Sequence, residues 1–325
     1  MPANMIDGEA VAKAMNELTI AAVAELKAAG RPPRLVAVQV GENPASKIYT
    51  NMQAKNCNSV GISYQLLNLP ESISQEQLLI KIAELNASRQ VTGLILQMPL
   101  PAHLDARKVQ VAISPAKDVE GMHPENMGRL FYGGGVVSPC TPMAAVELLR
   151  RTCPDLAGKE VVVVGHSEIV GKPIAAILLQ SLNASPTVTV CHVATKDLAS
   201  HTKAADILFV ATGVSQARWM GYQRRKKAGE TVTPPSLAPL ISGDMIKPGA
   251  IVIDVAINRI PAALDANGEP ALDEKGKPKM KTVGDVDFEA AKEVASAITP
   301  VPGGVGPVTV AMLLANTIAC AKAMA

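Results

Sequence analysis

Residues 159–173 read KEVVVVGHSEIVGKP, and this stretch sets the fold class. Its four valines are typical of a strand buried on both faces, and a glycine-containing turn then leads into a helix. Gly165 permits a tight turn, and Gly171 permits close packing of the helix on the strand. Backbone N–H groups at such a turn, with the positive end of the helix behind them, can bind a pyrophosphate. Because Ser167 replaces the second glycine of the G-x-G-x-x-G pattern, an ordinary strand-to-helix turn remains an alternative.

Strand-like and helix-like segments alternate on both sides of this turn. Strands are predicted at 34–41, 62–69, 91–98, 159–165, 187–192, 206–212 and 250–257. Helices are predicted at 8–29, 45–59, 74–87, 142–151, 169–182 and 306–323. This alternation predicts an α/β protein with parallel sheets and helices on their faces.

The length of 325 residues corresponds to about two domains. Residues 113–142 break the alternation with prolines and glycines, and we interpret them as a long structured loop that crosses into the second domain. We therefore expect an N-terminal α/β domain formed by residues 1–141 and 299–325, with the last helix returning to it. Residues 142–298 are expected to form a Rossmann-like dinucleotide-binding domain.

Two stretches, residues 215–239 and 260–281, look like insertions in the second domain. The first carries the single tryptophan and a basic cluster, Arg224 to Lys227, while the second is rich in glycine, proline and lysine. The second shows no period, and each is expected to be a solvated loop or hairpin. The alternative is that the basic cluster binds an anion or a partner.

The composition excludes several classes of protein. Lys and Arg total 31 against 29 for Asp and Glu, and this near-balance argues against a nucleic-acid partner. Aromatic residues make up only 2%, too few for a base-stacking surface. The 5 cysteines are scattered, so neither a disulfide framework nor a metal site is indicated. No secretory signal or membrane-spanning run is evident, so we expect a soluble cytoplasmic protein without a membrane partner.

Polar residues near the ends of predicted elements are further candidates for chemistry. Tyr49 and Gln53 share one face of a predicted helix, and Gln97 ends an apolar strand, where open α/β sheets bind ligands. Asp118 and Glu120 lie in the long loop and could accept hydrogen bonds from a ligand's amino and ring N–H groups. Each of these signals, taken alone, also fits an ordinary polar helix face, strand end or turn.

The stretch TPVPGGVGP, residues 299–307, precedes the last predicted helix. Its prolines and glycines predict a rigid loop whose backbone can approach a ligand closely, although a simple hinge would look the same.

These motifs occur in one order across nearly the whole chain, and together they closely resemble the methylenetetrahydrofolate dehydrogenase/methenyltetrahydrofolate cyclohydrolase family. They are Tyr49-x3-Gln53-x-Lys55, Gln97-Met-Pro-Leu-Pro, KDVEG-x-HP (117–124), PCTP (139–142), G-x-S-x-I-V-G-x-P (165–173), IDV-x-IN (253–258), VGDV (283–286) and TPVPGGVGP (299–307). The PVPGGVGP motif is highly specific to that family.

The resemblance implies oxidation of 5,10-methylenetetrahydrofolate by NADP or NAD, usually followed by hydrolysis of the methenyl product to 10-formyltetrahydrofolate. It also implies that the first domain and the last helix form the floor of a folate cleft, and that the protein is a homodimer joined through its cofactor domains. The implied catalytic residues are Tyr49, Gln53, Gln97 and Glu120. The implied folate contacts are Tyr49, Gln97, Asp118, Glu120, Pro302, Gly303, Gly304, Val305 and Gly306. The implied dinucleotide contacts are Cys140, Gly165, His166, Ser167, Val170, Gly171, His192, Val193 and Ile257.

The most important departure from the family pattern is Gln53. The family's catalytic lysine falls four residues after the tyrosine, and the match at Lys55 and Cys57 fixes this frame. Glutamine carries no charge and cannot exchange a proton near neutral pH. We therefore expect weak or absent cyclohydrolase activity, with hydride transfer retained.

Two further departures concern ligand contacts. Glu120 replaces the usual aspartate of the pterin site and is one methylene longer. His166 and Val193 stand where the family often holds the 2′-phosphate of NADP, and Val193 offers no hydrogen bond. NADP is the family default, with Lys172 and Lys196 as further 2′-phosphate candidates, and NAD is the rival. Two other functions remain open, namely a different two-domain dehydrogenase and a folate- or dinucleotide-binding protein with little catalysis.

Overall fold

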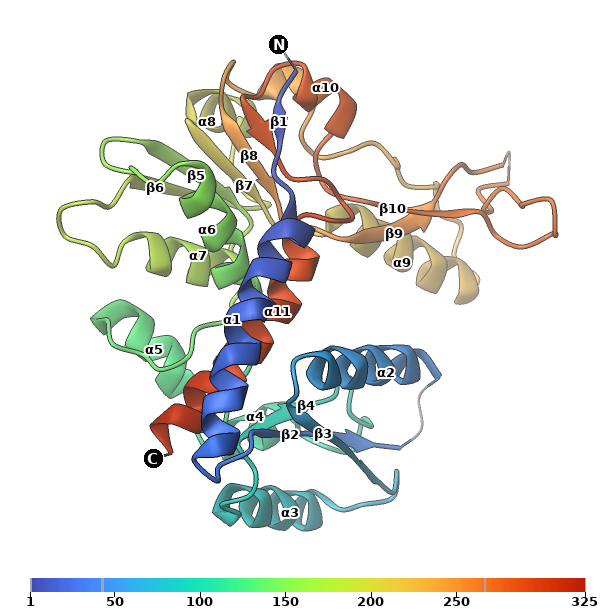
Figure 1. Ribbon diagram of the computed structural model, residues 1–325. Coiled ribbons are helices and arrows are strands. Elements are labelled where there is room, and N and C mark those ends of the chain that lie inside the picture. Colours follow the sequence, from blue (N-terminus) through green and yellow to red (C-terminus); the bar gives the residue numbers. More distant parts are fainter. Residues whose placement is uncertain (1, 42–43, 266, 325) are drawn as a thin grey trace. The chain divides into compact units, whose positions relative to one another are not determined.

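The computed structural model describes residues 2–41, 44–265 and 267–324 (Figure 1). The chain forms two compact units. Unit 1 contains Met1–Glu9 and Ala144–Pro307, and unit 2 contains Ala10–Met143 and Val308–Ala325. Each unit has a parallel sheet and helices, which confirms the predicted α/β class with two domains.

Unit 2 is built on a three-stranded parallel sheet in the order β3-β2-β4. Its strands are β2 (Arg34–Val40), β3 (Ser63–Leu69) and β4 (Gly93–Leu96). Its helices include α2 (Pro44–Ser59), α3 (Gln75–Ala87), α4 (Ala106–Ala112) and α5 (Pro124–Tyr132). The central strand β2 is buried from Leu35 to Val40, because it has a strand on each side and helices on both faces.

Alternate residues of β2 face two separate apolar cores. On one face, Leu35 belongs to the core that contains residues of α1 (Gly8–Ala28) and Leu314 of α11 (Val305–Ala323). On the other face, Val36 packs in the core formed with α3 and α4. The last helix therefore completes the core of unit 2, as predicted.

Helix α11 is, among the residues that the structure describes, the one helix long and apolar enough to cross a membrane. More than half of its most apolar window is buried inside the protein, and Ile318 and Cys320 belong to the core around Leu35. The apolar composition of α11 therefore follows from its place in that core.

Unit 1 is built on a six-stranded parallel sheet in the order β1-β11-β8-β7-β5-β6. Its strands are β1 (Asn4–Met5), β5 (Glu160–Val164), β6 (Thr187–Cys191), β7 (Ile207–Val210), β8 (Ile251–Asp254) and β11 (Ala297–Ile298). Its helices are α7 (Gly171–Leu178), α8 (Leu198–Ala204), α9 (Val214–Lys227) and α10 (Phe288–Lys292), while α6 (Cys140–Thr152) leads into it from unit 2. The chain continues from β5 to β6 on one side and to β7 on the other, which creates a topological switch point. Open α/β sheets bind ligands at the carboxyl ends of the strands at such a point.

Compact unit 1 also includes residues 1–9 and 299–307, whereas the sequence analysis places both segments in the first domain. Strand β1 pairs in parallel with β11, with Asn4 opposite Ala297, and so adds one strand to the large sheet. The start of α1 is also attached to unit 1, because the N–H of Gly8 donates a hydrogen bond to the carbonyl oxygen of Gly303, in the loop before α11. A strand of two residues carries no periodic signal, so the sequence did not predict this pairing.

Residues 113–142 are not one long loop, contrary to prediction, because they contain α5 and the start of α6. Helix α5 begins with Pro124 in its first turn, and Nδ1 of His123 accepts a hydrogen bond from the N–H of Glu125. Its buried residues are only Asn126 and Leu130. So few buried positions leave no readable helical period.

The prediction of a loop or hairpin at residues 215–239 is wrong for the first half of that segment, which forms α9. Its buried residues, Ser215, Trp219 and Tyr222, lie three to four positions apart and therefore share one face. Two of them pack with Ile260, which lies far away in the sequence. A local pattern could not reveal that partner.

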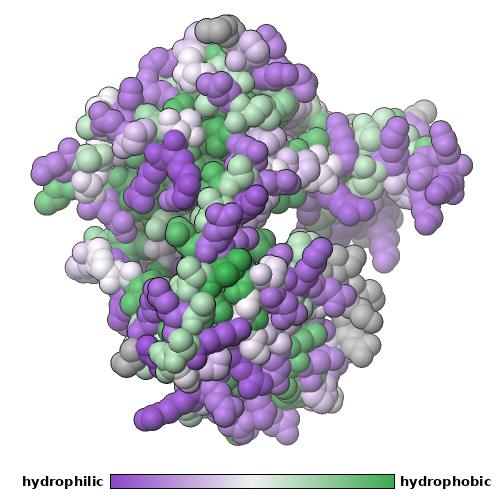
Figure 2. All heavy atoms as spheres, in the orientation of Figure 1, coloured by the Kyte–Doolittle hydropathy of each residue, from purple (hydrophilic) through white to green (hydrophobic). Residues whose placement is uncertain are grey.

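The segment 260–281 belongs to a hairpin, one of the two predicted forms, in which β9 (Asn258–Pro261) and β10 (Met280–Val283) pair antiparallel. Together with α9 it builds what we call the arm, residues 214–239 and 258–283, which has a small core of its own. Figure 1 shows α9 beside the two strands, and Figure 2 shows that the arm's visible surface is mainly hydrophilic.

The basic cluster at the end of α9 is partly paired within the arm. Arg225 pairs with Glu230 at 2.6 Å, and Lys226 pairs with Glu269 of the hairpin at 2.6 Å. These ion pairs link α9 to the segment that follows it and to the hairpin. The basic cluster is therefore less available to an external anion than its sequence suggests.

Candidate functional site

The structure brings together two of the predicted catalytic residues of unit 2. Gln53 lies on α2, and Gln97 follows the carboxyl end of β4. The Nε2 of Gln97 donates a hydrogen bond to Oε1 of Gln53 at 2.8 Å. Tyr49 lies one turn before Gln53 on α2, but its side chain falls outside the described part of the structure.

A third side chain, that of Tyr64 on β3, joins this pair and was missed by the sequence analysis. Its hydroxyl donates to the same oxygen of Gln53 at 3.0 Å. Burial, with a further effect of nearby Cys57, raises the pKa of Tyr64 to about 12. The hydroxyl therefore keeps its proton and acts as a donor throughout the working pH range. Tyr64 is one of 4 tyrosines in an aromatic-poor chain, and that scarcity was the only available signal.

The predicted acids Asp118 and Glu120 lie in the segment between α4 and α5 but have different surroundings. The buried Asp118 accepts hydrogen bonds at Oδ2 from the N–H of His123 at 2.7 Å and from Nδ2 of Asn126 at 3.0 Å. These bonds fold the loop onto the start of α5. Burial and the charge of Asp118 raise the pKa of Glu120 to about 7. Glu120 can therefore be either protonated or ionised near neutral pH.

Helix α11 holds this loop through Asn316, which sequence reasoning also missed. Its Nδ2 donates to the carbonyl oxygens of Val119 and Ser138, each at 2.9 Å, and lies 3.4 Å from Sγ of Cys140. Burial and nearby Glu120 raise the pKa of Cys140 well above its ordinary value, so the thiol stays protonated. A buried asparagine in an otherwise apolar helix is the signal that could have identified it.

We expect Glu120 to make the stability of the protein depend on pH. Its folded-state pKa of about 7 exceeds its ordinary value of 4.5, so the folded protein keeps a proton that the unfolded chain releases. The resulting stabilisation is fully present below pH 4.5 and is lost as pH rises through about 7. Urea titrations at pH 5 and pH 8 should show that Glu120→Gln flattens this fall by about 1–3 kcal/mol. An unchanged pH dependence in Glu120→Gln would contradict the assignment.

In unit 1 the turn after β5 has the geometry predicted from its glycines. Gly165 has φ +123°, and a Cβ at this position would lie 2.4 Å from the carbonyl oxygen of Ala211. A Cβ on Gly171 would lie 1.9 Å from the carbonyl oxygen of Gly165. Ser167 closes the turn, since its Oγ accepts from the N–H of Val170 at 3.1 Å. Backbone packing therefore requires glycine at both positions, and the pyrophosphate site assigned to this turn before α7 stays a prediction.

The ends of β5 and β6 bring two further predicted residues together. The rings of His166 and His192 lie 4.7 Å apart between centroids, at the carboxyl edge of adjacent strands. Val193 follows and is fully exposed, and Ile257 is exposed after β8. Residues 192–196 include no acid, although an Asp or Glu near this position commonly binds the ribose 2′-hydroxyl of NAD.

The buried carboxylate of Asp285, in the VGDV motif, organises the end of β7. Its Oδ2 accepts hydrogen bonds from the N–H groups of Thr212 and Gly213, each at 2.9 Å, and from the Thr212 hydroxyl. Its Oδ1 accepts from Nδ2 of Asn258 at 2.9 Å. Asp285 thereby fixes the turn beside Ala211, against which Gly165 packs.

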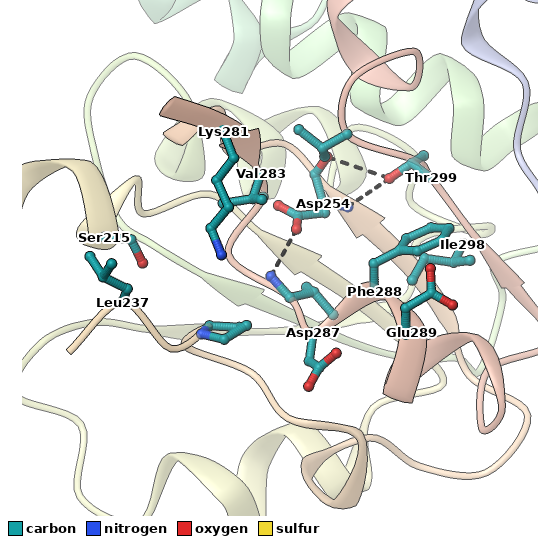
Figure 3. Close-up of a pocket in the computed structure, with 14 residues that line it drawn as sticks. Ser215, Leu237, Asp254, Lys281, Val283, Asp287, Phe288, Glu289, Ile298 and Thr299 are labelled. Atoms are coloured by element: carbon teal, nitrogen blue, oxygen red, sulfur yellow. Dashed lines mark hydrogen bonds between the residues drawn. The ribbon is translucent and has the colours of Figure 1, made fainter. Parts of the chain in front are cut away.

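A cavity of about 310 Å³ lies in unit 1 next to Asp254, at the end of β8 (Figure 3). Asp254 Oδ2 accepts from the N–H of Val286 at 2.9 Å, and Oγ1 of Thr299 accepts from the N–H of Asp254 at 2.8 Å. Burial, together with the charge of Asp285, raises the pKa of Asp254 to about 7. Asp254, at the end of β8, is thus hydrogen-bonded to two loops, one at Val286 and the other at Thr299, where TPVPGGVGP begins.

The glycines of that loop meet a packing requirement. Gly303 has φ +105°, and a Cβ on Gly304 would lie 2.6 Å from the carbonyl oxygen of Pro300. A Cβ on Gly8, at the start of α1, would lie 1.8 Å from the carbonyl oxygen of Gly304. The positive φ of Gly303 and the close packing at Gly304 and Gly8 therefore explain these three glycines without a ligand, and the folate contacts assigned to residues 302–306 stay a prediction.

Comparison with known proteins identifies relatives for both parts of the chain. Residues 6–120 match the family model described as tetrahydrofolate dehydrogenase/cyclohydrolase, catalytic domain. Residues 139–219 and 226–325 match the corresponding NAD(P)-binding domain. Residues 220–225, which fall between the two matched parts of the NAD(P)-binding domain, lie within α9, so part of the arm is an extension beyond the family model.

Individual relatives agree with these matches. The bifunctional protein FolD of Chloroherpeton thalassium is 48% identical over 289 residues, which cover 88% of this chain and 87% of that protein. The crystal structure of the bifunctional FolD methylenetetrahydrofolate dehydrogenase/cyclohydrolase of Campylobacter jejuni superimposes with a TM-score of 0.80 at 39% identity, covering 98% and 99% of the two chains. The Trypanosoma brucei methylenetetrahydrofolate dehydrogenase-cyclohydrolase, solved with NADP and an inhibitor, has a TM-score of 0.80 at 34% identity, covering 99% and 98%.

Proposed function

The chain belongs to the tetrahydrofolate dehydrogenase/cyclohydrolase family, and from that premise we propose that it oxidises 5,10-methylenetetrahydrofolate to 5,10-methenyltetrahydrofolate. The proposed cofactor is NADP, with NAD as the alternative. We also propose that hydrolysis of the methenyl product to 10-formyltetrahydrofolate is weak. The observation that carries this division is Gln53, a neutral side chain hydrogen-bonded to Gln97 where the family pattern has a lysine.

The oxidation requires little acid–base catalysis from the protein. The carbon that loses the hydride lies between two nitrogens, which share the positive charge of the product. The nicotinamide cofactor, when bound, accepts the hydride, so the chain has mainly to bind and orient the substrate. Gln53 and Gln97 offer amide groups fixed by their mutual hydrogen bond. The carboxyl group of Glu120 can accept hydrogen bonds from the amino and ring N–H groups of the pterin.

Hydrolysis requires acid–base assistance from the residue at position 53. Water must add to the methenyl carbon, and the ring must then open with movement of a proton. A lysine at position 53 could assist through its charge and its proton, but the amide of Gln53 can do neither. We therefore assign this chain mainly dehydrogenase activity.

The proposed dinucleotide site uses the turn from Gly165 to Gly171 for the pyrophosphate. The lack of an acid at residues 192–196 favours NADP, because a carboxylate there would repel the 2′-phosphate. His166, Lys172 and Lys196 are the candidate ligands of that phosphate. Val193 offers it no hydrogen bond, and for this reason NAD remains the alternative.

The remaining assignments also stay proposals. They comprise the roles of Tyr49, Asp118 and Cys140 toward ligands, a homodimer formed through the cofactor domains, and a cytoplasmic location.

Purified protein should reduce nicotinamide only when 5,10-methylenetetrahydrofolate is present. The absorbance of the reduced cofactor, followed with NADP and with NAD, gives kcat/KM for each. We expect a preference for NADP, and a preference for NAD beyond about tenfold, or 1.4 kcal/mol, would reverse the cofactor choice.

The alternative function is a folate- or dinucleotide-binding protein with little catalysis, which Gln53 also favours. Tight binding of both ligands without folate-dependent reduction of either cofactor would establish that alternative and refute the dehydrogenase.

A further inference from the structure

We propose that Tyr64 is a positioning residue that orients the amide of Gln53 so that its N–H groups face the folate. This inference rests on the proposed function, because it concerns how the same site holds its substrate. Tyr64 belongs to none of the motifs that mark the family resemblance, and only the folded chain brings it to Gln53.

The geometry gives one amide oxygen two donors from two different elements. Tyr64 Oη reaches Oε1 of Gln53 from the start of β3 at 3.0 Å, and Gln97 Nε2 reaches it from the end of β4 at 2.8 Å. A carbonyl oxygen has two lone pairs, so both are used. Among the residues that the structure describes, Nε2 of Gln53 has no such partner. Within the described part of the chain, the half-buried amide is thus held by its oxygen alone, and its N–H groups have no hydrogen-bond acceptor.

A glutamine needs this help more than a lysine does. Rotation of the amide by half a turn exchanges an acceptor for a donor, and the two orientations are nearly equal in shape. Folate presents lone pairs on its ring nitrogens and carbonyl oxygens, so an N–H facing them binds and an oxygen facing them repels. A lysine ammonium has donors only, so rotation of its end group presents no acceptor.

The properties of Tyr64 suit a permanent donor. Its ring packs against the core that contains Leu35 and Cys57, which fixes the direction of the hydroxyl. Its pKa of about 12 keeps the proton on the oxygen at every pH near neutrality. Tyr64 therefore acts through Gln53 by hydrogen bonding and exchanges no proton during the reaction.

The test is a double-mutant cycle of Tyr64→Phe with Gln53→Lys, assayed for dehydrogenase activity. Tyr64→Phe removes only the hydroxyl and should raise KM for methylenetetrahydrofolate about 3- to 10-fold, the effect of one lost hydrogen bond, with KM for the cofactor unchanged. In the Gln53→Lys background the same change should alter the folate KM less than about twofold, because lysine needs no orientation. The matched control is Tyr132→Phe, at an exposed tyrosine of the same unit, which should change neither constant.

Several outcomes would overturn the proposal. An equal effect of Tyr64→Phe in both backgrounds would mean that the hydroxyl acts only on packing, and an equal rise in cofactor KM would mean a general disturbance. Loss of an alkaline limb from the pH–rate profile would mean that Tyr64 exchanges a proton. No change in folate KM would show that the hydroxyl is dispensable.

Direct binding keeps this test separate from the proposed function. Calorimetric titration with 5-formyltetrahydrofolate, a stable folate, measures Kd even if the protein transfers no hydride. A 3- to 10-fold weaker Kd in Tyr64→Phe, absent from the Gln53→Lys background, supports the positioning role whether or not the dehydrogenase is confirmed. An unchanged Kd in Tyr64→Phe refutes that role.

Discussion

Replacing Gln53 with lysine should raise the rate of methenyltetrahydrofolate hydrolysis by about 10²–10⁴, the usual value of general acid–base assistance. The new ammonium would stand where two polar groups already converge, near the hydroxyl of Tyr64 and the amide of Gln97. The Gln97 amide can turn its oxygen toward the ammonium, so the charge would enter a site with an acceptor present. Hydride transfer should change much less, because the substrate nitrogens already stabilise the product cation.

The control for this gain is Met52→Lys. It adds the same charge one residue earlier on α2, at a position that is 49% exposed. The decay of methenyltetrahydrofolate should match the unmodified protein in Met52→Lys and should be fast in Gln53→Lys. If the unmodified protein already hydrolyses the compound far above the spontaneous rate, and Gln53→Lys adds nothing, the missing charge has no role in this step.

Replacing Asp285 with asparagine should lower the free energy of unfolding of unit 1 by about 3–5 kcal/mol, near the upper limit for single substitutions. The carboxylate is fully buried and accepts hydrogen bonds from Thr212, Gly213 and Asn258. An amide of the same shape must turn its NH2 group toward one of these donors. At least one buried N–H then loses its partner.

Urea unfolding followed by the fluorescence of Trp219 measures this loss, because the single tryptophan of the chain lies in unit 1. The matched control is Asp206→Asn at the opposite end of β7, where the carboxylate accepts from the N–H of Glu160 and pairs with Lys247 on a partly exposed surface. The control should cost less than about 1 kcal/mol. If Asp285→Asn lowers the free energy of unfolding by no more than this control does, water replaces the hydrogen bonds of the Asp285 carboxylate.

Features of the site that depend on neighbours in sequence could be predicted, and those that depend on distant partners could not. The turn at Gly165 and Gly171 follows from residues within one strand-to-helix connection, and its geometry agrees with the prediction. Asp285 meets Thr212 across 73 residues, and Asn316 meets Val119 across 197. No local period encodes such contacts, so in the sequence these donors and acceptors cannot be told from polar side chains that face water.

Helix α9 could not be predicted because its packing partner is also distant in the sequence. A helix is recognisable when apolar residues mark one face, but the buried face of α9 consists of Ser215, Trp219 and Tyr222 among many charged residues. Its apolar partner is the hairpin, which the sequence analysis treated as a separate loop. The parallel strands were easier to predict, because a strand such as β5 is apolar on both faces whatever its neighbours are.

The order in which the ribosome makes this chain adds a constraint that follows from its path between the units. The chain passes from one unit to the other at residues 9–10, 143–144 and 307–308. Unit 1 lacks β11 until residue 298 has emerged, and the core of unit 2 lacks Leu314 and Ile318 until the last helix is made. Neither unit can complete its core during most of translation, so its apolar strands stay exposed to solvent. We therefore expect nascent chains truncated before residue 300 to engage chaperones and to resist folding as isolated domains.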